Sequence, residues 1–274
     1  DYLSYKNLFM RDFTIVIYNI LLSELRLNNY TFQTVHESFV CPNTRSIILR
    51  HDVDDRKENS LQFARIQYEL GIVGTYYFRI IPQSFEPKVV QQIASLGHEI
   101  GYHYEDMDFA KGDPHKAIEL FDKHLKQLRE VADVKTICMH GSPLSKYDNR
   151  DLWNHYDYRD FGIIAEPYFD LDFSTILYLT DTGRRWNGDN VSIRDRSASD
   201  RINPYMEGKR PLSDNYKFRS TFDIIQACGK GDLPDKIMFN FHPQRWTDNN
   251  MLWTSELISQ NVKNTVKWAI NKYR

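Results

Sequence analysis

The chain has 274 residues, of which 41% are hydrophobic and 26% charged, a composition typical of a globular protein with a sizeable core. Its formal net charge of −2 gives no electrostatic reason to expect nucleic acid or an anionic membrane as the main partner. The longest apolar run near the start, residues 13–22, is too short to span a bilayer, so we expect no stable membrane insertion.

The hydrophobic pattern predicts helices and strands that alternate along most of the chain. Apolar residues three to four positions apart, together with glycine stop signals, predict helices over residues 5–27, 59–70, 87–96, 115–131 and 257–273. Runs of apolar, β-branched and aromatic residues predict strands over residues 46–50, 74–81, 98–102, 135–139, 162–165 and 236–241. This alternation favours a parallel α/β fold, and a barrel is one form that such a fold takes.

Two parts of the chain depart from the alternation. We interpret residues 1–40 as an N-terminal helical extension. Residues 170–233 contain the turn-rich stretches TDTGRRWNGDN and RINPYMEGKRPLSDN, and we interpret them as long irregular loops or an insertion within the domain. Since no repeat or long linker divides the chain, we expect a single catalytic domain over residues 1–274.

Polar side chains suited to proton transfer and metal binding follow four of the predicted strands. Asp52 and Asp54 follow the first strand, and His103, His140 and His242 each follow one of the others. Because the active sites of parallel α/β folds lie at the carboxyl ends of the strands, we predict that these side chains converge on one site.

The pair Asp52 and Asp54 is the most informative of these groups. The two residues are two positions apart on an extended segment, so their side chains project from the same face. Neighbouring carboxylates repel each other unless a cation lies between them or one keeps its proton. A divalent metal would resolve this, with one carboxylate as ligand and the other as base; a capping or turn role is the alternative. We expect Asp55 to face away and cap the next helix, and His98 to be structural.

The segments around these residues resemble the motifs of the polysaccharide deacetylase (NodB-homology, carbohydrate esterase 4-like) family. The segments are LRHDVDD at 49–55, GHEIGYH at 97–103, HGSP at 140–143 and IMFNFHP at 237–243, and they follow the family's order and spacing across residues 46–245. The resemblance implies a distorted (β/α) barrel that holds one divalent metal, usually zinc. It also implies the removal of N- or O-acetyl groups from sugars.

The resemblance implies a role for most of the strand-end residues. Asp52 matches the general base of the family, Asp54 a metal ligand, His103 a second ligand, and His242 the general acid. The family's other ligand histidine would fall on position 107, which is methionine in this chain. One metal ligand is therefore missing from the family pattern.

Three substitutes for the missing ligand remain open. His140 has the preferred ligand chemistry and arrives from a neighbouring strand, so we favour it. Its competing roles are to orient Asp52 or to contact substrate, since the third motif of the family usually supplies an arginine near the base. Glu105 is the second substitute and also a candidate substrate contact, and the third option is that no metal binds tightly. Arg184 and Trp186, in the turn-rich stretch, are candidates for a sugar subsite, and a structural role is the equal alternative for both.

The resemblance leads us to expect a metal-dependent hydrolase that removes an acetyl group from a sugar of a surface polysaccharide or its precursor. Met107 keeps two alternatives open, namely a C–N hydrolase acting on another amide and a sugar-binding protein without catalysis. A pure binder would not need acids and bases at four strand ends. We expect a carboxylate near His242, because this histidine must be charged when the C–N bond breaks.

The cysteines and the chain start bear on the cellular compartment. Cys41, Cys138 and Cys228 are odd in number and form no Cys-x-x-Cys pair, so neither a disulfide scaffold nor a cysteine zinc site is indicated. No leader is visible at the start of the sequence, which begins with Asp1. We therefore expect a cytoplasmic location.

Overall fold

The computed structural model describes residues 10–141, 145–186 and 204–273, with side chains described up to residue 265 in the last helix. Seven strands form one parallel sheet: β1 (Thr31–Gln33), β2 (Ser46–Val53), β3 (Thr75–Phe78), β4 (Glu99–Tyr104), β5 (Val134–Met139), β6 (Leu177–Thr180) and β7 (Lys236–Phe241). Their order is β5-β4-β3-β2-β7-β6, and β1 pairs with the first half of β2. The α/β class predicted from the sequence is confirmed.

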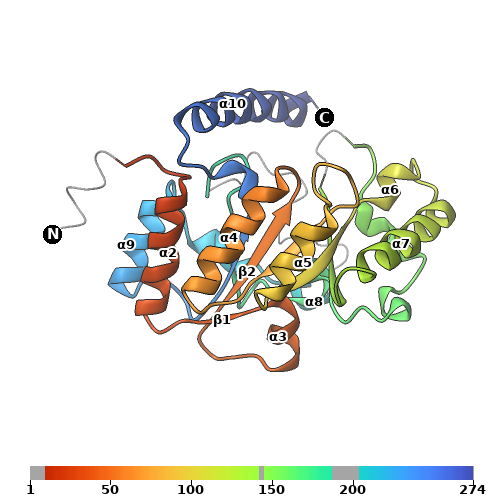
Figure 1. The fold of residues 1–274 in the computed structure, drawn as a ribbon, viewed down its shortest axis with the longest axis horizontal. Helices are drawn as coiled ribbons and strands as arrows, with labels where there is room; N and C mark the ends of the chain where they lie inside the picture. The colour runs from red at the N-terminus through yellow and green to blue at the C-terminus, as the bar shows by residue number, and fades with distance from the viewer. Residues whose placement is uncertain (1–9, 142–144, 187–203, 274) are drawn as a thin grey trace.

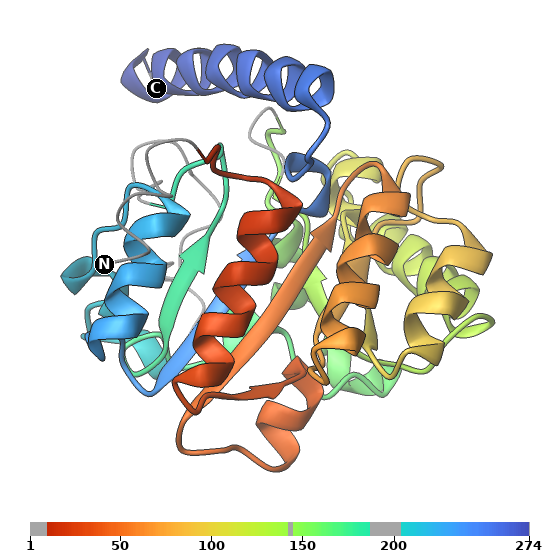
Figure 2. The same ribbon diagram turned by 60° about the vertical axis from the view of Figure 1, so that its left-hand side comes forward.

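The described α-helices are α2 (Ile15–Leu27), α3 (Val35–Val40), α4 (Lys57–Glu69), α5 (Pro87–Ser95), α6 (Asp106–Phe109), α7 (Pro114–Arg129), α8 (Pro167–Asp170), α9 (Thr221–Lys230) and α10 (Asn250–Tyr273). Figures 1 and 2 show α9, α2, α4, α5 and α7 in succession, while α10 lies across the end toward which the strands point. The carboxyl edge of the sheet therefore lies on the α10 side of the molecule.

Local sequence signals account for several helix starts. Thr34 and Ser220 each form a capping box at the start of α3 and α9, in which the side chain and the third helical residue exchange hydrogen bonds. Helix α4 begins differently. Its N-cap residue is Arg56, which has a left-handed φ of 50° and makes no side-chain hydrogen bond to the helix. Asp55 accepts a hydrogen bond from the Arg56 backbone N–H. The prediction that Asp55 caps this helix is therefore wrong.

The sheet does not close into the predicted barrel. Within the described residues its two ends are β5 and β6, which do not pair with each other. The predicted strand over residues 162–165 contributes only an isolated bridge between Ala165 and Thr136. Gly162, with a left-handed φ of 69°, and Pro167, at the first position of α8, bound this segment. The extended stretch between them is too short to build a ladder that would close the sheet.

The two regions that depart from the sequence pattern carry more of the sheet than we predict. The described part of residues 1–40 supplies β1, and its helix α2 packs beside α9, as Figure 1 shows. This region is therefore integrated into the domain and is more than a helical extension. The region 170–233 supplies β6 and α9 in addition to irregular segments, and residues 187–203 of it lie outside the described residues.

Strand β2 is the centre of the core and is buried along its whole length. Strands on both sides and helices over the sheet cover it, as expected for a central parallel strand. Because even its polar residues are enclosed, each needs a partner within the protein. Arg50, His51 and Asp52 all lie on this strand, and the partners of His51 are structural. Its ring stacks on Tyr76, with ring centroids 4.2 Å apart.

His51 should make stability depend on pH. Its Nδ1 donates to the Thr75 carbonyl, while Nε2 lies 3.1 Å from the Tyr18 hydroxyl and 2.8 Å from Gln67 Nε2. Burial lowers the pKa of His51 to about 3 from its ordinary value of 6.5. Below pH 6.5 the His51 ring becomes protonated in the unfolded chain but stays neutral in the folded protein. The contribution of His51 to the free energy of unfolding is therefore fully present above pH 6.5 and is lost as the pH falls toward 3.

We therefore expect the His51→Gln variant to be less sensitive to acid than the wild type. The free energy of unfolding of the wild type should fall by about 2 kcal/mol more between pH 7 and pH 5 than that of the variant, at ~1.4 kcal/mol per proton and pH unit. Urea unfolding at the two pH values measures this difference. Equal losses in both proteins would show that His51 is not held neutral in the folded state.

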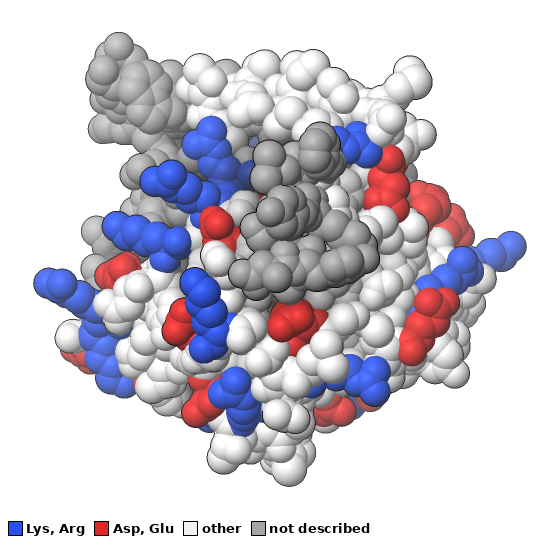
Figure 3. Space-filling model, turned by 90° about the vertical axis from the view of Figure 1, so that its left-hand side faces the viewer, with Lys and Arg blue, Asp and Glu red and all other residues white. Residues whose placement is uncertain are grey.

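Two further features of the described residues concern membrane spans and the distribution of charge on the surface. No helix in the described part of the chain is long and apolar enough to cross a membrane. Figure 3 shows that lysines and arginines are interspersed with aspartates and glutamates over the face it presents. The charge distribution there is mixed, as the small net charge of the chain leads one to expect.

Candidate active site

The five side chains predicted from the strand ends lie together at the carboxyl edge of the sheet. His103 Nε2 lies 3.8 Å from Asp52 Oδ2 and 3.6 Å from Asp54 Oδ1. His140 Nδ1 lies 3.1 Å from Asp54 Oδ1. His242 Nε2 lies 4.0 Å from Asp52 Oδ2 and 3.8 Å from Asp54 Oδ2. Strands β2, β4, β5 and β7 thus each bring an acid or an imidazole to one point.

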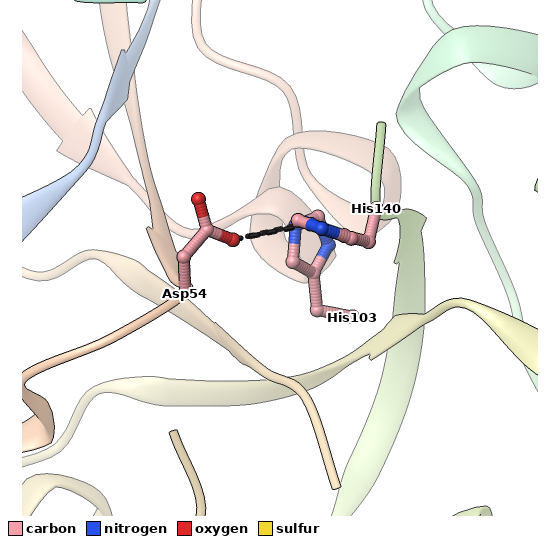
Figure 4. A group of neighbouring side chains, drawn as sticks. All are labelled: Asp54, His103 and His140. Atoms are coloured by element: carbon pink, nitrogen blue, oxygen red, sulfur yellow. Dashed lines mark hydrogen bonds and ion pairs between the residues drawn. The ribbon is translucent and has the colours of Figure 1, made fainter. Parts of the chain in front are cut away.

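Three of these residues form a group with the geometry of a metal site. Asp54, His103 and His140 each offer one ligand atom, and these atoms all lie within 4.8 Å of one another. Figure 4 shows the Asp54 carboxylate and the two imidazole rings turned toward a common point. Two imidazole nitrogens and one carboxylate oxygen form a ligand set that suits zinc and leaves a fourth position open.

Two observations show that these residues fit a divalent cation. His103 Nδ1 lies 2.8 Å from the Cys138 carbonyl, to which it can only donate, so Nε2 faces the group as the unprotonated nitrogen, 3.3 Å from His140 Nδ1. Asp54 Oδ1 is buried, and its near polar neighbours among the described residues are the two imidazole nitrogens of the group, His140 Nδ1 at 3.1 Å and His103 Nε2 at 3.6 Å. A buried carboxylate oxygen with so few donors costs free energy. A cation bound between the three residues would pair with this oxygen and with both nitrogens.

The charge states of His103 and Asp54 are also those that metals bind. Burial lowers the pKa of His103 to about 4, so its imidazole is neutral at neutral pH. Burial would raise the pKa of Asp54, but His140, with His242 and His103, outweighs it and holds this pKa well below its ordinary value. Neutral imidazole and ionised carboxylate are the ligating forms, so His103 and Asp54 need no deprotonation to accept a cation.

Asp52 is held as a carboxylate by neighbours of its own. Arg50 donates to both of its oxygens, over 2.8 Å from Nε and 2.7 Å from Nη2. Asn240 on β7 donates to Oδ2 over 3.0 Å. Burial would raise the pKa of Asp52, but the Arg50 charge and two histidines leave it below its ordinary value. Sequence reasoning missed Arg50, although its position two residues before Asp52 on one strand places both side chains on the same face.

The carboxylate expected near His242 is Asp181, which directly follows β6. Its Oδ1 lies 2.6 Å from His242 Nδ1, and its Oδ2 accepts from the His242 backbone N–H over 3.0 Å. Arg245 and Trp246 also donate to Asp181, over 3.0 and 2.6 Å. Burial would raise the pKa of Asp181, but His242 and Arg245 lower it below its ordinary value. Sequence reasoning missed this residue because it lies in the region interpreted as irregular.

Glu105 and Met107 do not join the ligand group. Arg79, beyond the end of β3, donates to both oxygens of Glu105 over 2.8 and 2.6 Å. Glu105 Oε2 lies 4.0 Å from His140 Nε2, on the side of the ring away from Asp54. Met107, at the position of the missing histidine, is buried in the hydrophobic core. The geometry therefore favours His140 over Glu105 as the third ligand.

Arg184 and Trp186 are buried and contact residues outside the ligand group. Trp186 is 4% exposed, packs against Phe239 and Phe241, and donates from its indole to Thr221. Arg184 is 7% exposed, and its guanidinium lies over the ring of Trp253, 4.7 Å from the centroid. Both side chains are buried against aromatic rings, and the sugar subsite stays a prediction.

Comparisons with known proteins give little guidance. No family model matches the chain, and no curated protein matches it. Among solved structures it is similar to the crystal structure of the Xyl-CE4 domain of a multidomain xylanase from the hindgut metagenome of Trinervitermes trinervoides. That match has a TM-score of 0.35 and 14% identity, and covers 81% of this chain and 85% of the other. A likeness this weak supports no inference about function. Function is therefore inferred from the residues of the site.

Proposed function

We propose that the protein is a metal-dependent hydrolase that removes an N- or O-acetyl group from a sugar of a surface polysaccharide or its precursor. One observation carries the proposal. A three-residue ligand group, a carboxylate held ionised by arginine and a histidine paired with a buried aspartate meet at one point, where His242 Nε2 lies 4.0 Å from Asp52 Oδ2 and 3.8 Å from Asp54 Oδ2. This is the set of groups that hydrolysis of an acyl bond requires.

Asp54, His103 and His140 would hold the cation, and zinc is the ion that their chemistry fits best. Bound there, a divalent cation would polarise the acyl carbonyl and lower the pKa of a water molecule. The three residues contribute one negative charge between them. This leaves a net positive centre that favours an oxyanion beside it.

Asp52 is the proposed general base. Its carboxylate is ionised at neutral pH and lies beside the ligand group, 3.8 Å from His103 Nε2. As the water oxygen forms its bond to the acyl carbon, Asp52 takes the proton that the water gives up. Arg50 and Asn240 keep the carboxylate oriented, so this transfer needs no rearrangement of the site.

His242 is the proposed general acid. Asp181 binds its Nδ1, so that Nε2 faces Asp52 and Asp54 across the site. When the tetrahedral intermediate collapses, the bond from carbon to the leaving nitrogen or oxygen breaks and Nε2 supplies the proton. The Asp181 carboxylate fixes the orientation of the imidazole for this transfer.

The sugar part of the proposal rests on the resemblance of the four sequence motifs to the deacetylase family. Acids, bases and ligands alone would serve hydrolysis of another amide equally well. The departure from the motif at Met107, with His140 in the ligand group instead, favours keeping a C–N hydrolase of a non-sugar amide as a second candidate.

Acetate release tests the proposal. We expect zinc-loaded wild-type protein to release acetate from at least one member of a panel of N-acetylhexosamine oligosaccharides, nucleotide sugars and O-acetylated glycans. The chelated protein and the Asp52→Asn variant serve as matched controls and should release none above background. Release of an amine from cyclic or peptide amides, with none from the glycans, would favour the second candidate. Zinc-loaded protein that is inactive on both panels would contradict a hydrolase.

A further inference from the structure

Gln244 contacts one of the proposed ligands and has no role in the mechanism above. It lies in the short 3₁₀ helix η6 (Pro243–Arg245), directly after β7 and His242. Its side-chain Nε2 donates a hydrogen bond to Asp54 Oδ2 over 3.3 Å. The residue is buried, with 9% of its surface exposed. Its contact therefore persists in an enclosed environment where water competes little.

Asp54 needs such a partner because the sheet does not fix its carboxylate. Strand β2 ends at Val53, and Asp54 follows in a tight turn in which its N–H bonds to the Asp52 carbonyl. The last torsion of an aspartate side chain is soft, so its two oxygens exchange places easily. With Oδ2 bound to Gln244, it is Oδ1 that faces His103 and His140.

The chemistry of an amide suits this task. Its N–H donor is neutral, so it fixes the carboxylate without neutralising the charge that attracts a cation, as a lysine or arginine would. Were the amide reversed, its oxygen would face a carboxylate oxygen, so the donor must point to Asp54. Gln244 Oε1 is itself buried without a partner among the described residues. The side chain therefore occupies this place at a cost in stability.

We propose that Gln244 is a positioning residue of the metal site, which holds Oδ2 of Asp54 so that Oδ1 is the oxygen offered to the cation. This inference rests on the proposed function, because it presupposes that Asp54, His103 and His140 bind a divalent ion. Partners that orient metal ligands typically contribute 10–100-fold in affinity, roughly the effect expected here.

The chain offers a matched control on the other aspartate. Asn240 donates to Asp52 Oδ2 over 3.0 Å, just as Gln244 donates to Asp54. Both amides are buried and lie within five residues of each other at the end of β7. Loss of the Asn240 amide should disturb the proposed base, Asp52, and leave the three proposed metal ligands in place.

The test is the affinity for zinc, measured by competition with a chromophoric chelator. We expect Gln244→Met, which keeps the length of the side chain and removes the N–H donor, to raise the Kd by about 10–100-fold. Asn240→Leu should leave the Kd near that of the wild type. Gln244→Ala, which removes the amide without adding a thioether, should repeat the result of Gln244→Met. Circular dichroism of the metal-free variants establishes that each is folded.

The outcomes separate this inference from the proposed function. An unchanged Kd in folded Gln244→Met and Gln244→Ala would overturn the positioning role and leave the metal site standing. An equal loss of zinc affinity in Asn240→Leu would also overturn the positioning role, because the effect would then come from a general loss of order at the carboxyl edge of the sheet. Wild-type protein that binds no zinc would overturn the proposed function itself, and the inference with it.

Discussion

Replacing Asp52 with asparagine is expected to lower kcat by about 10²–10⁴-fold, the range that general acid–base catalysis contributes, while zinc still binds. Asparagine has the shape of the carboxylate but cannot take a proton. Asp52 is not one of the three residues whose ligand atoms form the metal group. Kinetics and zinc content of the same preparation measure the two effects together.

This variant also changes stability, and its controls must allow for that. Asp52 is the counter-charge of Arg50, which is 1% exposed, and breaking a buried ion pair costs about 3–5 kcal/mol. The assay therefore belongs at a temperature where circular dichroism shows the variant folded. Asp55→Asn makes the same chemical change three residues along, at an exposed position, and should leave the rate unchanged. A folded Asp52→Asn protein with wild-type kcat would show that the base lies elsewhere.

The site was largely predictable because one rule about parallel sheets governs it. Strand patterns placed Asp52, Asp54, His103, His140 and His242 after four strands, and parallel strands bring such ends to a common edge. The rule needs only approximate strand boundaries. It placed these residues at the same edge although β2 and β4 extend through Asp52 and His103 and do not end before them.

The closure of the sheet was not predictable in the same way. A barrel requires pairing between strands at its two open edges, and this depends on lengths and registers that local patterns do not set. Residues 162–165 look like a strand, yet only Ala165 bridges to Thr136. The resemblance to the deacetylase family implied a distorted barrel, and the described residues form an open sheet.

The residues that support the site were the hardest to find in the sequence. Asp181 follows β6, whose four residues LYLT are too short to stand out within a turn-rich region. Its importance appears only in three dimensions, where it accepts from His242, Arg245 and Trp246. Trp186 also lies in the turn-rich region, and its burial depends on packing against Phe13 and Phe239, which are distant in the sequence.

Removing either histidine of the ligand group is expected to weaken zinc binding by more than about 100-fold, since even partners of metal ligands contribute 10–100-fold. His103 and His140 each supply one of only three ligand atoms. His140 is the more informative of the two, because it is the residue proposed as third ligand in place of the histidine that the motif resemblance would put at position 107. His115 is a suitable control, since it is an exposed histidine on α7, where it contacts Tyr156.

The zinc content of wild type, His140→Ala and His115→Ala after zinc loading and dialysis tests the account most directly. We predict about one zinc ion per chain in the wild type and in His115→Ala, and a loss of bound zinc in folded His140→Ala. Wild-type protein without stoichiometric metal, or a His140→Ala variant that keeps its full zinc content, would contradict a centre built from Asp54, His103 and His140.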